Sequence, residues 1–138
     1  MIRTMRLANF KCFEDETLVF RPLTIVAGAN GAGKSSLLQG LLLAQQASES
    51  RVDYVKLNGP FLLSLGKTGD VVCQFMFGES GVEIELTLDD GTPLRWPFEE
   101  SPKEEHILTV SARPPSIRPL DLTYLNAERI GPRDTQDV

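Results

Sequence analysis

The sequence feature that most restricts the fold is an abrupt change of pattern within residues 23–47. Residues 23–27 read LTIVA, an apolar run with β-branched members that predicts a strand buried on both faces. Three glycines then fall within residues 28–33, and from Lys34 the apolar residues recur with the period of a helix. The helix is predicted to run to about Ala47, with an apolar stripe made by Leu37, Leu38, Leu41, Leu42 and Ala44. A strand, a glycine-rich loop and a helix in this order predict a phosphate-binding loop.

The loop itself matches a known phosphate-binding motif. Residues 28–35, GANGAGKS, agree with the Walker A pattern G-x-x-x-x-G-K-[ST] at every fixed position. Glycines allow backbone angles that other residues resist, so successive amide N–H groups can point inward and bind an anion beside the positive end of the helix. A plain glycine turn is the alternative, but it gives no reason for lysine followed by serine at the start of the helix.

The side chains of the motif have predicted roles in holding a nucleoside triphosphate, which we expect to be ATP with Mg²⁺. Lys34 supplies a positive charge for the β- and γ-phosphates, and Ser35 Oγ is placed to ligate Mg²⁺. Ser36 is placed to hydrogen-bond a phosphate oxygen. The predicted nucleotide-contacting residues of the loop and helix start are Asn30, Gly31, Ala32, Gly33, Lys34, Ser35 and Ser36.

Alternation of apolar and polar residues predicts strands on both sides of this loop and helix. Residues 2–9 and 17–20 precede it, with a loop at 10–16, and residues 71–77, 82–88, 107–110 and 122–127 follow it. Residues 89–92 predict a hairpin turn, after which Leu94, Trp96 and Phe98 alternate on the returning strand. Pro93 and Pro97 indicate that this strand lies at a sheet edge. Residues 51–69 carry turn signals and no clear pattern. The strands after them predict an antiparallel meander with one solvated face.

Composition narrows the class of protein. The net charge of −5 argues against a broad nucleic-acid-binding surface, which is normally basic. Cys12 and Cys73 fit no zinc pattern and are expected to be small buried residues. His106 is the only histidine, which leaves histidine-based metal sites and Ser-His-Asp chemistry almost nothing to draw on. No apolar run approaches the roughly 20 residues of a membrane helix, so we expect a cytoplasmic protein.

Two segments taken together resemble a known family. Residues 6–13, RLANFKCF, and residues 23–38, LTIVAGANGAGKSSLL, are similar to the N-terminal lobe of ABC-type ATPases of the SMC, RecF and OLD-like group, often called AAA family ATPases. A softer similarity to one branch runs through residues 62–66 with 70–71, and through residues 124–133. The resemblance implies an α/β fold, a P-loop NTPase of the ABC-type ATPase head, with a mixed β core, a Walker A helix and an antiparallel β subdomain.

Within a single ATP-binding lobe of residues 1–138, the resemblance divides the chain into three parts. Residues 1–50 would hold the first strands, the Walker A loop and its helix, residues 51–120 the antiparallel subdomain, and residues 121–138 a strand and a polar tail. The loop after the first strand often lies beside the nucleotide in this group, which implies a nucleotide contact for Lys11, followed by Cys12 and Phe13. A solvated loop charge is the alternative for Lys11.

The resemblance also implies groups that the sequence does not supply. A Q-loop would follow a strand at residues 124–127, but it has no glutamine, and the nearest polar candidates are Asn126, Glu128 and Arg129. Asp70 and Asp121 lack the apolar run of a Walker B strand, and Asp89-Asp90 follows an alternating one. The signature motif is missing as well. We therefore expect an N-terminal lobe without catalytic residues of its own, inactive alone, whose full-length parent hydrolyses ATP.

Partners follow from the same resemblance. Hydrolysis would need the missing C-terminal lobe and dimerisation, and relatives act on DNA in repair or in anti-phage defence. A different class of function, a non-catalytic interaction module, would use the exposed sheet around Trp96 and Phe98 to dock a partner. A small P-loop kinase or GTPase is a third alternative, against which the guanine-specific N-K-x-D motif is absent.

Overall fold

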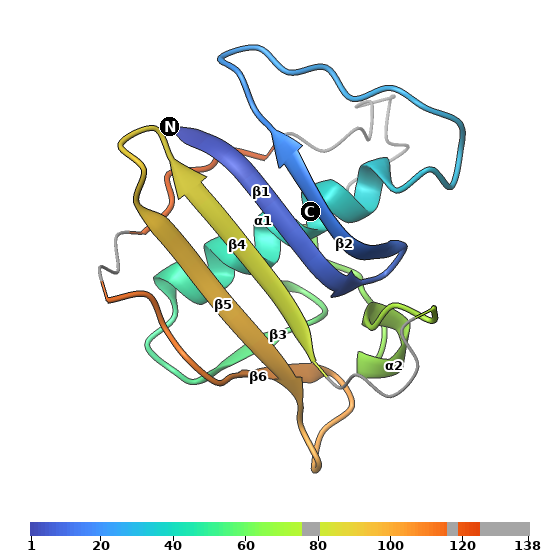
Figure 1. The fold of residues 1–138 in the computed structure, drawn as a ribbon. Coiled ribbons are helices and arrows are strands. Elements are labelled where there is room, and N and C mark those ends of the chain that lie inside the picture. Colours follow the sequence, from blue (N-terminus) through green and yellow to red (C-terminus); the bar gives the residue numbers. More distant parts are fainter. Residues whose placement is uncertain (76–80, 116–118, 125–138) are drawn as a thin grey trace, which may run out of the picture.

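The computed structural model describes residues 1–75, 81–115 and 119–124, which form one sheet with a long helix across one face (Figure 1). The described strands pair in the order β2-β1-β4-β5-β6-β3, and each of these pairs is antiparallel. The strands are β1 (Ile2–Phe10), β2 (Phe13–Val19), β3 (Tyr54–Lys56), β4 (Val82–Leu88), β5 (Pro93–Glu100) and β6 (Ile107–Val110). The helices are α1 (Lys34–Glu49), the 3-10 turn η1 (Pro60–Leu62) and the short α2 (Thr68–Val71).

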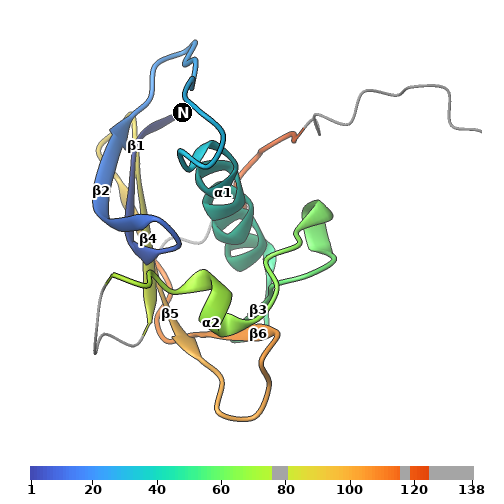
Figure 2. The same ribbon diagram turned by 90° about the vertical axis from the view of Figure 1, so that its right-hand side faces the viewer.

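The edge-on view shows α1 lying along one face of the central strands (Figure 2), and the buried side chains of the core belong to both. Side chains that alternate along β1, β4 and β5 point to the helix and are almost fully buried: Met5, Leu7, Ile84, Leu86, Leu94, Trp96 and Phe98. The helix packs closely on β1, because a Cβ built at Gly40 would stand 2.8 Å from Met5 Cε and 2.9 Å from Leu7 Cδ2. This contact fixes where α1, and the loop before it, sit relative to the sheet.

Most of the predicted elements are confirmed. The strand at residues 2–9, the helix from Lys34, the strands at 82–88 and 107–110 and the returning strand after residue 92 all form. The turn at 89–92 forms as well, with Gly91 N–H donating to Leu88 O at 3.0 Å. β2 begins at Phe13 rather than at residue 17, because Phe10 pairs with Phe13 and leaves a turn of only two residues. The predicted loop at 10–16 is therefore wrong for residues 13–16.

The predicted buried strand at residues 23–27 is not formed. These residues have no strand conformation, and the side chains of Leu23 and Ile25 are 79% and 80% exposed. A strand buried on both faces needs a ladder partner on each side, and the described residues supply none to this segment. Every strand pair in the described residues is antiparallel, so the predicted mixed β core is not seen in this part of the chain.

Two further strand predictions are corrected. Within residues 71–77, Val71 ends α2 and Val72 makes a single bridge to Phe10, while residues 76 and 77 lie outside the described part of the chain. A helix forms before Val72 because the Asp70 carboxylate accepts the N–H of Lys67 at 2.9 Å and caps the turn. Residues 122–124 are not in a strand, and residues 125–127 lie outside the described part.

The position of β5 differs from the edge that its prolines indicated. β5 lies between β4 and β6, but β6 pairs only with residues 98–100 of it. Pro93 and Pro97 precede that pairing, so neither has to donate to the β6 ladder. Two prolines therefore occur in a strand that has a neighbouring strand on each side.

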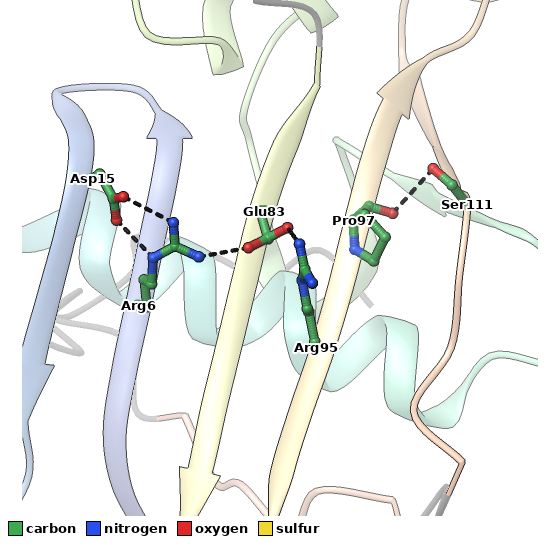
Figure 3. A network of polar contacts seen from close by, with 6 residues as sticks. All are labelled: Arg6, Asp15, Glu83, Arg95, Pro97 and Ser111. Atoms are coloured by element: carbon green, nitrogen blue, oxygen red, sulfur yellow. Dashed lines mark hydrogen bonds and ion pairs between the residues drawn. The ribbon is translucent and has the colours of Figure 1, made fainter.

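The face of the sheet opposite α1 carries a network of ion pairs across four strands (Figure 3). Arg6 on β1 donates to both carboxylate oxygens of Asp15 at 2.7 and 2.8 Å and to Glu83 on β4 at 2.6 Å. Arg95 on β5 also pairs with Glu83. The hydrogen bond from Arg6 holds the pKa of Asp15 below its ordinary value. Such exposed pairs contribute little to stability, so this face is polar surface and not core.

No helix in the described part of the chain combines the length and the apolar character that crossing a membrane requires.

The two cysteines differ from each other in their exposure to solvent. Cys73 is buried as expected, whereas Cys12 is exposed, because it occupies the two-residue turn between β1 and β2. The expectation of a buried residue is therefore wrong for Cys12.

Candidate functional site

The glycine-rich loop ends at the first turn of α1 and leaves that turn open to a ligand. Gly31 and Gly33 have φ angles of 85° and 92°, in the left-handed region that favours glycine. Gly33 is the N-cap residue, and its carbonyl accepts the N–H of Leu37 at 2.9 Å. The N–H groups of residues 34–36 precede this bond and have no place in the helical ladder. They form the positive end of the helix dipole, which attracts anions.

Lys34 folds its side chain back over the loop. Its Nζ donates to Gly28 O at 2.5 Å and to Ala29 O at 2.6 Å. Among the described residues, no carboxylate forms an ion pair with this ammonium. The charge of Lys34 is thus compensated by two carbonyl dipoles and stays available to an anion.

A hollow of about 260 Å³ lies where the loop meets the helix. It is lined by Lys11, Cys12, Asn30, Gly31, Gly33, Lys34, Ser35 and Ser36. All the residues predicted to contact the nucleotide line it except Ala32, whose N–H closes a turn on Ala29 O at 3.2 Å. The lining combines two ammonium groups with two hydroxyls and contains no aspartate or glutamate, so it is suited to an anionic ligand.

The turn between β1 and β2 forms one wall of this hollow. A Cβ built at Gly33 would stand 2.7 Å from Cys12 Sγ and 3.1 Å from Phe13 Cζ, which shows how closely the turn packs on the loop. Lys11 has a φ of 52°, and its N–H donates to Val71 O at 2.7 Å. Residues 11–13 therefore lie beside the glycine-rich loop, and the nucleotide contact that the family resemblance implied for them stays a prediction.

A second hollow, of about 270 Å³, adjoins the first across Lys11 and Cys12. Its other lining residues are Asp70, Val72, Gln74 and Phe75, none of which was predicted as a site residue. The signal that could have found them is the turn chemistry at 66–70, where a glycine precedes an aspartate that caps a short helix. The sequence pattern predicted a strand at 71–77 and gave residues 51–69 no defined structure, so this cap was not recognised.

The acidic residues weighed for catalysis are placed outside the first hollow. Asp89 and Asp90 lie in the β4–β5 turn, where Asp90 Oδ1 accepts the N–H of Thr92 at 2.8 Å. In the described ranges no group of three or more histidine, cysteine, aspartate and glutamate side chains could hold a metal ion. The Q-loop candidates Asn126, Glu128 and Arg129 lie outside the described residues.

Comparison with known proteins places this loop and sheet in a family. The family model of the AAA domain matches residues 4–114, which include most of β1, the glycine-rich loop, α1 and β4 to β6. The chain belongs to the AAA domain family. This AAA domain is also similar over part of its length to an OLD nuclease and to a Rad50 ATPase, so the resemblance of its N-terminal region to the SMC, RecF and OLD-like group is confirmed.

Three relatives illustrate the similarity. The AAA domain is 42% identical over 41 residues to an OLD nuclease of Thermus scotoductus and 46% identical over 43 residues to a DNA double-strand break repair Rad50 ATPase of Sulfolobus acidocaldarius, each match covering 30% of the chain. It is 30% identical over 89 residues, or 64% of the chain, to an uncharacterized protein of Methanocaldococcus jannaschii. The matches span 8%, 5% and 41% of these relatives, respectively.

Proposed function

We propose that this AAA domain binds ATP with Mg²⁺ as the N-terminal lobe of an ABC-type ATPase of the SMC, RecF and OLD-like group. The observation that carries the proposal is the arrangement of Lys34. Its ammonium lies against the loop at Gly28 and Ala29, and it shares one hollow with the first turn of α1. A polyanion in that hollow would meet a full charge, free amide N–H groups and hydroxyls from one side.

The lining residues fit a triphosphate and a magnesium ion. Lys34 and Lys11 would neutralise phosphate charge, and the amides of residues 30–36 would hydrogen-bond phosphate oxygens. Ser35 Oγ would be a ligand of Mg²⁺, and Ser36 Oγ would donate to a phosphate. The bound metal ion would supply charge neutralisation at the bond that is cleaved. Since the hollow holds no carboxylate, the domain binds without a water-activating base of its own in this hollow.

Hydrolysis is proposed for a larger assembly. We place the Walker B carboxylates and the signature motif in a C-terminal lobe and in a second subunit, so dimerisation would complete the site. An assembly of this kind would work in the cytoplasm and would contact DNA through parts other than this acidic lobe, whose net charge is −5.

The proposal is tested with Lys34→Ala. We expect the variant to bind ATP with Mg²⁺ roughly 10- to 100-fold more weakly than the wild type, because a charge-assisted contact is lost. Isothermal titration calorimetry measures the affinity, and circular dichroism checks that the fold is kept. Lys103→Ala, which removes an exposed lysine in the β5–β6 connection, is the matched control and should bind normally. Equal ATP affinity in both variants would overturn the proposal.

A second candidate function is the docking of a protein partner. The structure favours the surface near Leu23 and Ile25 for it, rather than the predicted side chains of Trp96 and Phe98. The side chains of Trp96 and Phe98 cannot contact a partner, because they are 2% and 1% exposed and lie in the core. Apolar surface is exposed instead at Leu23 and Ile25. The residues just before them line an apolar cavity of about 510 Å³, formed by Ile2, Phe20, Leu41, Leu88, Leu94 and Leu120 among others. We place the contact with the C-terminal lobe on this surface.

A further inference from the structure

We propose that the outer edge of β2 binds an extended, basic segment of a partner protein, which adds a further strand to the sheet. β2 comes first in the order β2-β1-β4-β5-β6-β3 and lies at one margin of the sheet in Figure 1. Among the described strands it therefore pairs with β1 alone. An edge strand presents a row of N–H and C=O groups with which another chain can pair.

The first argument is the direction of the backbone groups of β2. Phe20 N–H donates to Arg3 O at 2.7 Å, in register with the paired residues of β1 and β2, so the even-numbered residues of β2 bond to β1. Because an antiparallel ladder alternates, the N–H and C=O groups of Asp15, Thr17 and Val19 point to the outer side. Within the described ranges, these outward groups have no backbone partner. β2 thus offers hydrogen bonds at three alternate positions.

The second argument is a contrast with the opposite edge of the sheet. β3 is three residues long, and the side-chain amide of Gln46 on α1 covers its outer side. Gln46 Nε2 donates to Lys56 O at 2.9 Å, and Gln46 Oε1 accepts the N–H of Lys56 at 2.6 Å. This amide takes the place that a further strand would occupy. β2 is seven residues long and contains neither lysine nor proline, the residues that commonly block an edge.

The third argument is charge. Glu14 and Glu16 are exposed, and their alternate positions place them on the same face of β2. In the part of the chain that the structure describes, neither forms an ion pair, whereas Asp15 between them pairs with Arg6. Lysine or arginine at alternate positions of an added strand would lie beside these two carboxylates. The same charges disfavour a second copy of this acidic strand, so the partner segment is basic.

The test uses a seven-residue peptide that alternates lysine with valine, added to the purified chain and followed by NMR. We expect the amide hydrogens of Asp15, Thr17 and Val19 to exchange more slowly with solvent when the peptide is bound, because they gain hydrogen-bond partners. A peptide of the same sequence, methylated at the alternate amide nitrogens that would face β2, should bind about tenfold more weakly or worse. This comparison keeps the charge and removes the backbone pairing.

Two variants examine charge and backbone separately. Glu14→Lys combined with Glu16→Lys should bind the lysine peptide about tenfold more weakly or worse and should bind a glutamate–valine peptide instead. Glu100→Lys combined with Glu104→Lys changes the net charge equally at exposed positions outside β2 and is the matched control. Thr17→Pro removes one outward N–H and leaves the bonds to β1, so it should also lose binding. Circular dichroism checks that each variant folds.

The outcomes decide between specific pairing and its alternatives. Protection of the outward amides together with the reversed charge preference supports the proposal. No protection at millimolar peptide, equal binding of the methylated peptide, or an equal loss in the control variant would overturn it. A dimer of the free chain in sedimentation that Thr17→Pro abolishes would assign the edge to a second copy and overturn it as well. Lys34→Ala should bind the peptide as the wild type does, so this edge and the proposed nucleotide site are tested independently.

Discussion

At the residue scale, Gly33 satisfies two requirements that no other residue type meets together. Its φ of 92° lies in the left-handed region, and its missing Cβ leaves room for Cys12 Sγ, which would otherwise be 2.7 Å away. The first requirement turns the chain into α1, and the second lets the β1–β2 turn close one wall of the hollow. Gly69 is a useful contrast, because a Cβ there would meet nothing within 4 Å.

We expect Gly33→Ala to lower the free energy of unfolding by about 1–3 kcal/mol, from left-handed strain and from the contact with Cys12. ATP binding should weaken as well, because the loop must shift to accept the methyl group. Urea denaturation and titration calorimetry measure the two effects. Gly69→Ala, at an uncrowded position in α2, should be neutral or slightly stabilising. Equal stability of the two variants would contradict this account.

At the element scale, α1 is held at its far end by a residue from a distant part of the chain. The last turn of the helix contains no basic residue. Arg113 occupies that end, where it donates to Ala47 O at 3.1 Å, to Ser50 O at 2.7 Å and to Val52 O, and pairs with Asp53 at 3.3 Å. A guanidinium favours the negative end of the helix dipole and satisfies carbonyls that the helix leaves unpaired.

We expect Arg113→Ala to lower the free energy of unfolding by about 2–3 kcal/mol, because several charge-assisted hydrogen bonds to carbonyls are lost. The free energy of unfolding of Arg113→Lys should lie between those of the wild type and Arg113→Ala, since a single ammonium cannot reproduce the planar fork of a guanidinium. Chemical denaturation followed by circular dichroism measures these values. Arg51→Ala removes an exposed arginine near the same end of α1 and serves as the control. A loss in Arg113→Ala no larger than in the control would show that the contacts carry no net stability.

The same scale shows how far the sequence predicts the fold. The sequence predicts four elements well: β1, β4, β5 and α1. Each has its apolar residues at the spacing of a strand or a helix, and this spacing lies within the element itself. Residues 23–27 and 71–77 were not predictable, because an apolar run becomes a strand only if another strand pairs with it. In the second case the Asp70 cap produced a helix instead. Strand order, and hence the place of β5, depends on pairings between residues far apart in the chain.

The candidate site was predictable to a similar extent. The loop residues follow from a motif with fixed spacing, and the place of Lys11 follows from the family resemblance. The second hollow could not be predicted. Phe75 lines it together with Lys11 and Cys12 because backbone hydrogen bonds join residues 9–11 to residues 71–73, which are far apart in the sequence. Contacts of that kind leave no periodic trace in the sequence.

At the scale of the whole molecule, one face of the sheet is covered by α1 and the other is a polar surface that carries the ion-pair network (Figures 2 and 3). Apolar surface remains exposed beside the loop, at Leu23, Ile25 and Val26. The site thus has one half whose lining is suited to an anion and an apolar flank, but no carboxylate in the hollow at the loop. This arrangement suits a lobe that holds a ligand and lets another part of an assembly act on it.

We therefore expect the purified chain to bind ATP without steady turnover. Phosphate release should match that of Lys34→Ala under saturating ATP and Mg²⁺, because no carboxylate in the first hollow can activate water. A coupled assay of free phosphate measures the rate. Steady release by the wild type that disappears in Lys34→Ala would show that the chain contains a catalytic group of its own.

The contacts of Lys34 with Gly28 O and Ala29 O have a consequence for affinity. Two of the three ammonium protons are donated to the protein's own backbone, so an incoming anion that takes more than the third proton must displace Gly28 O or Ala29 O. Any measured affinity is therefore the difference between two favourable states. Changes that loosen residues 28 and 29 could tighten ligand binding without adding a single contact to the ligand.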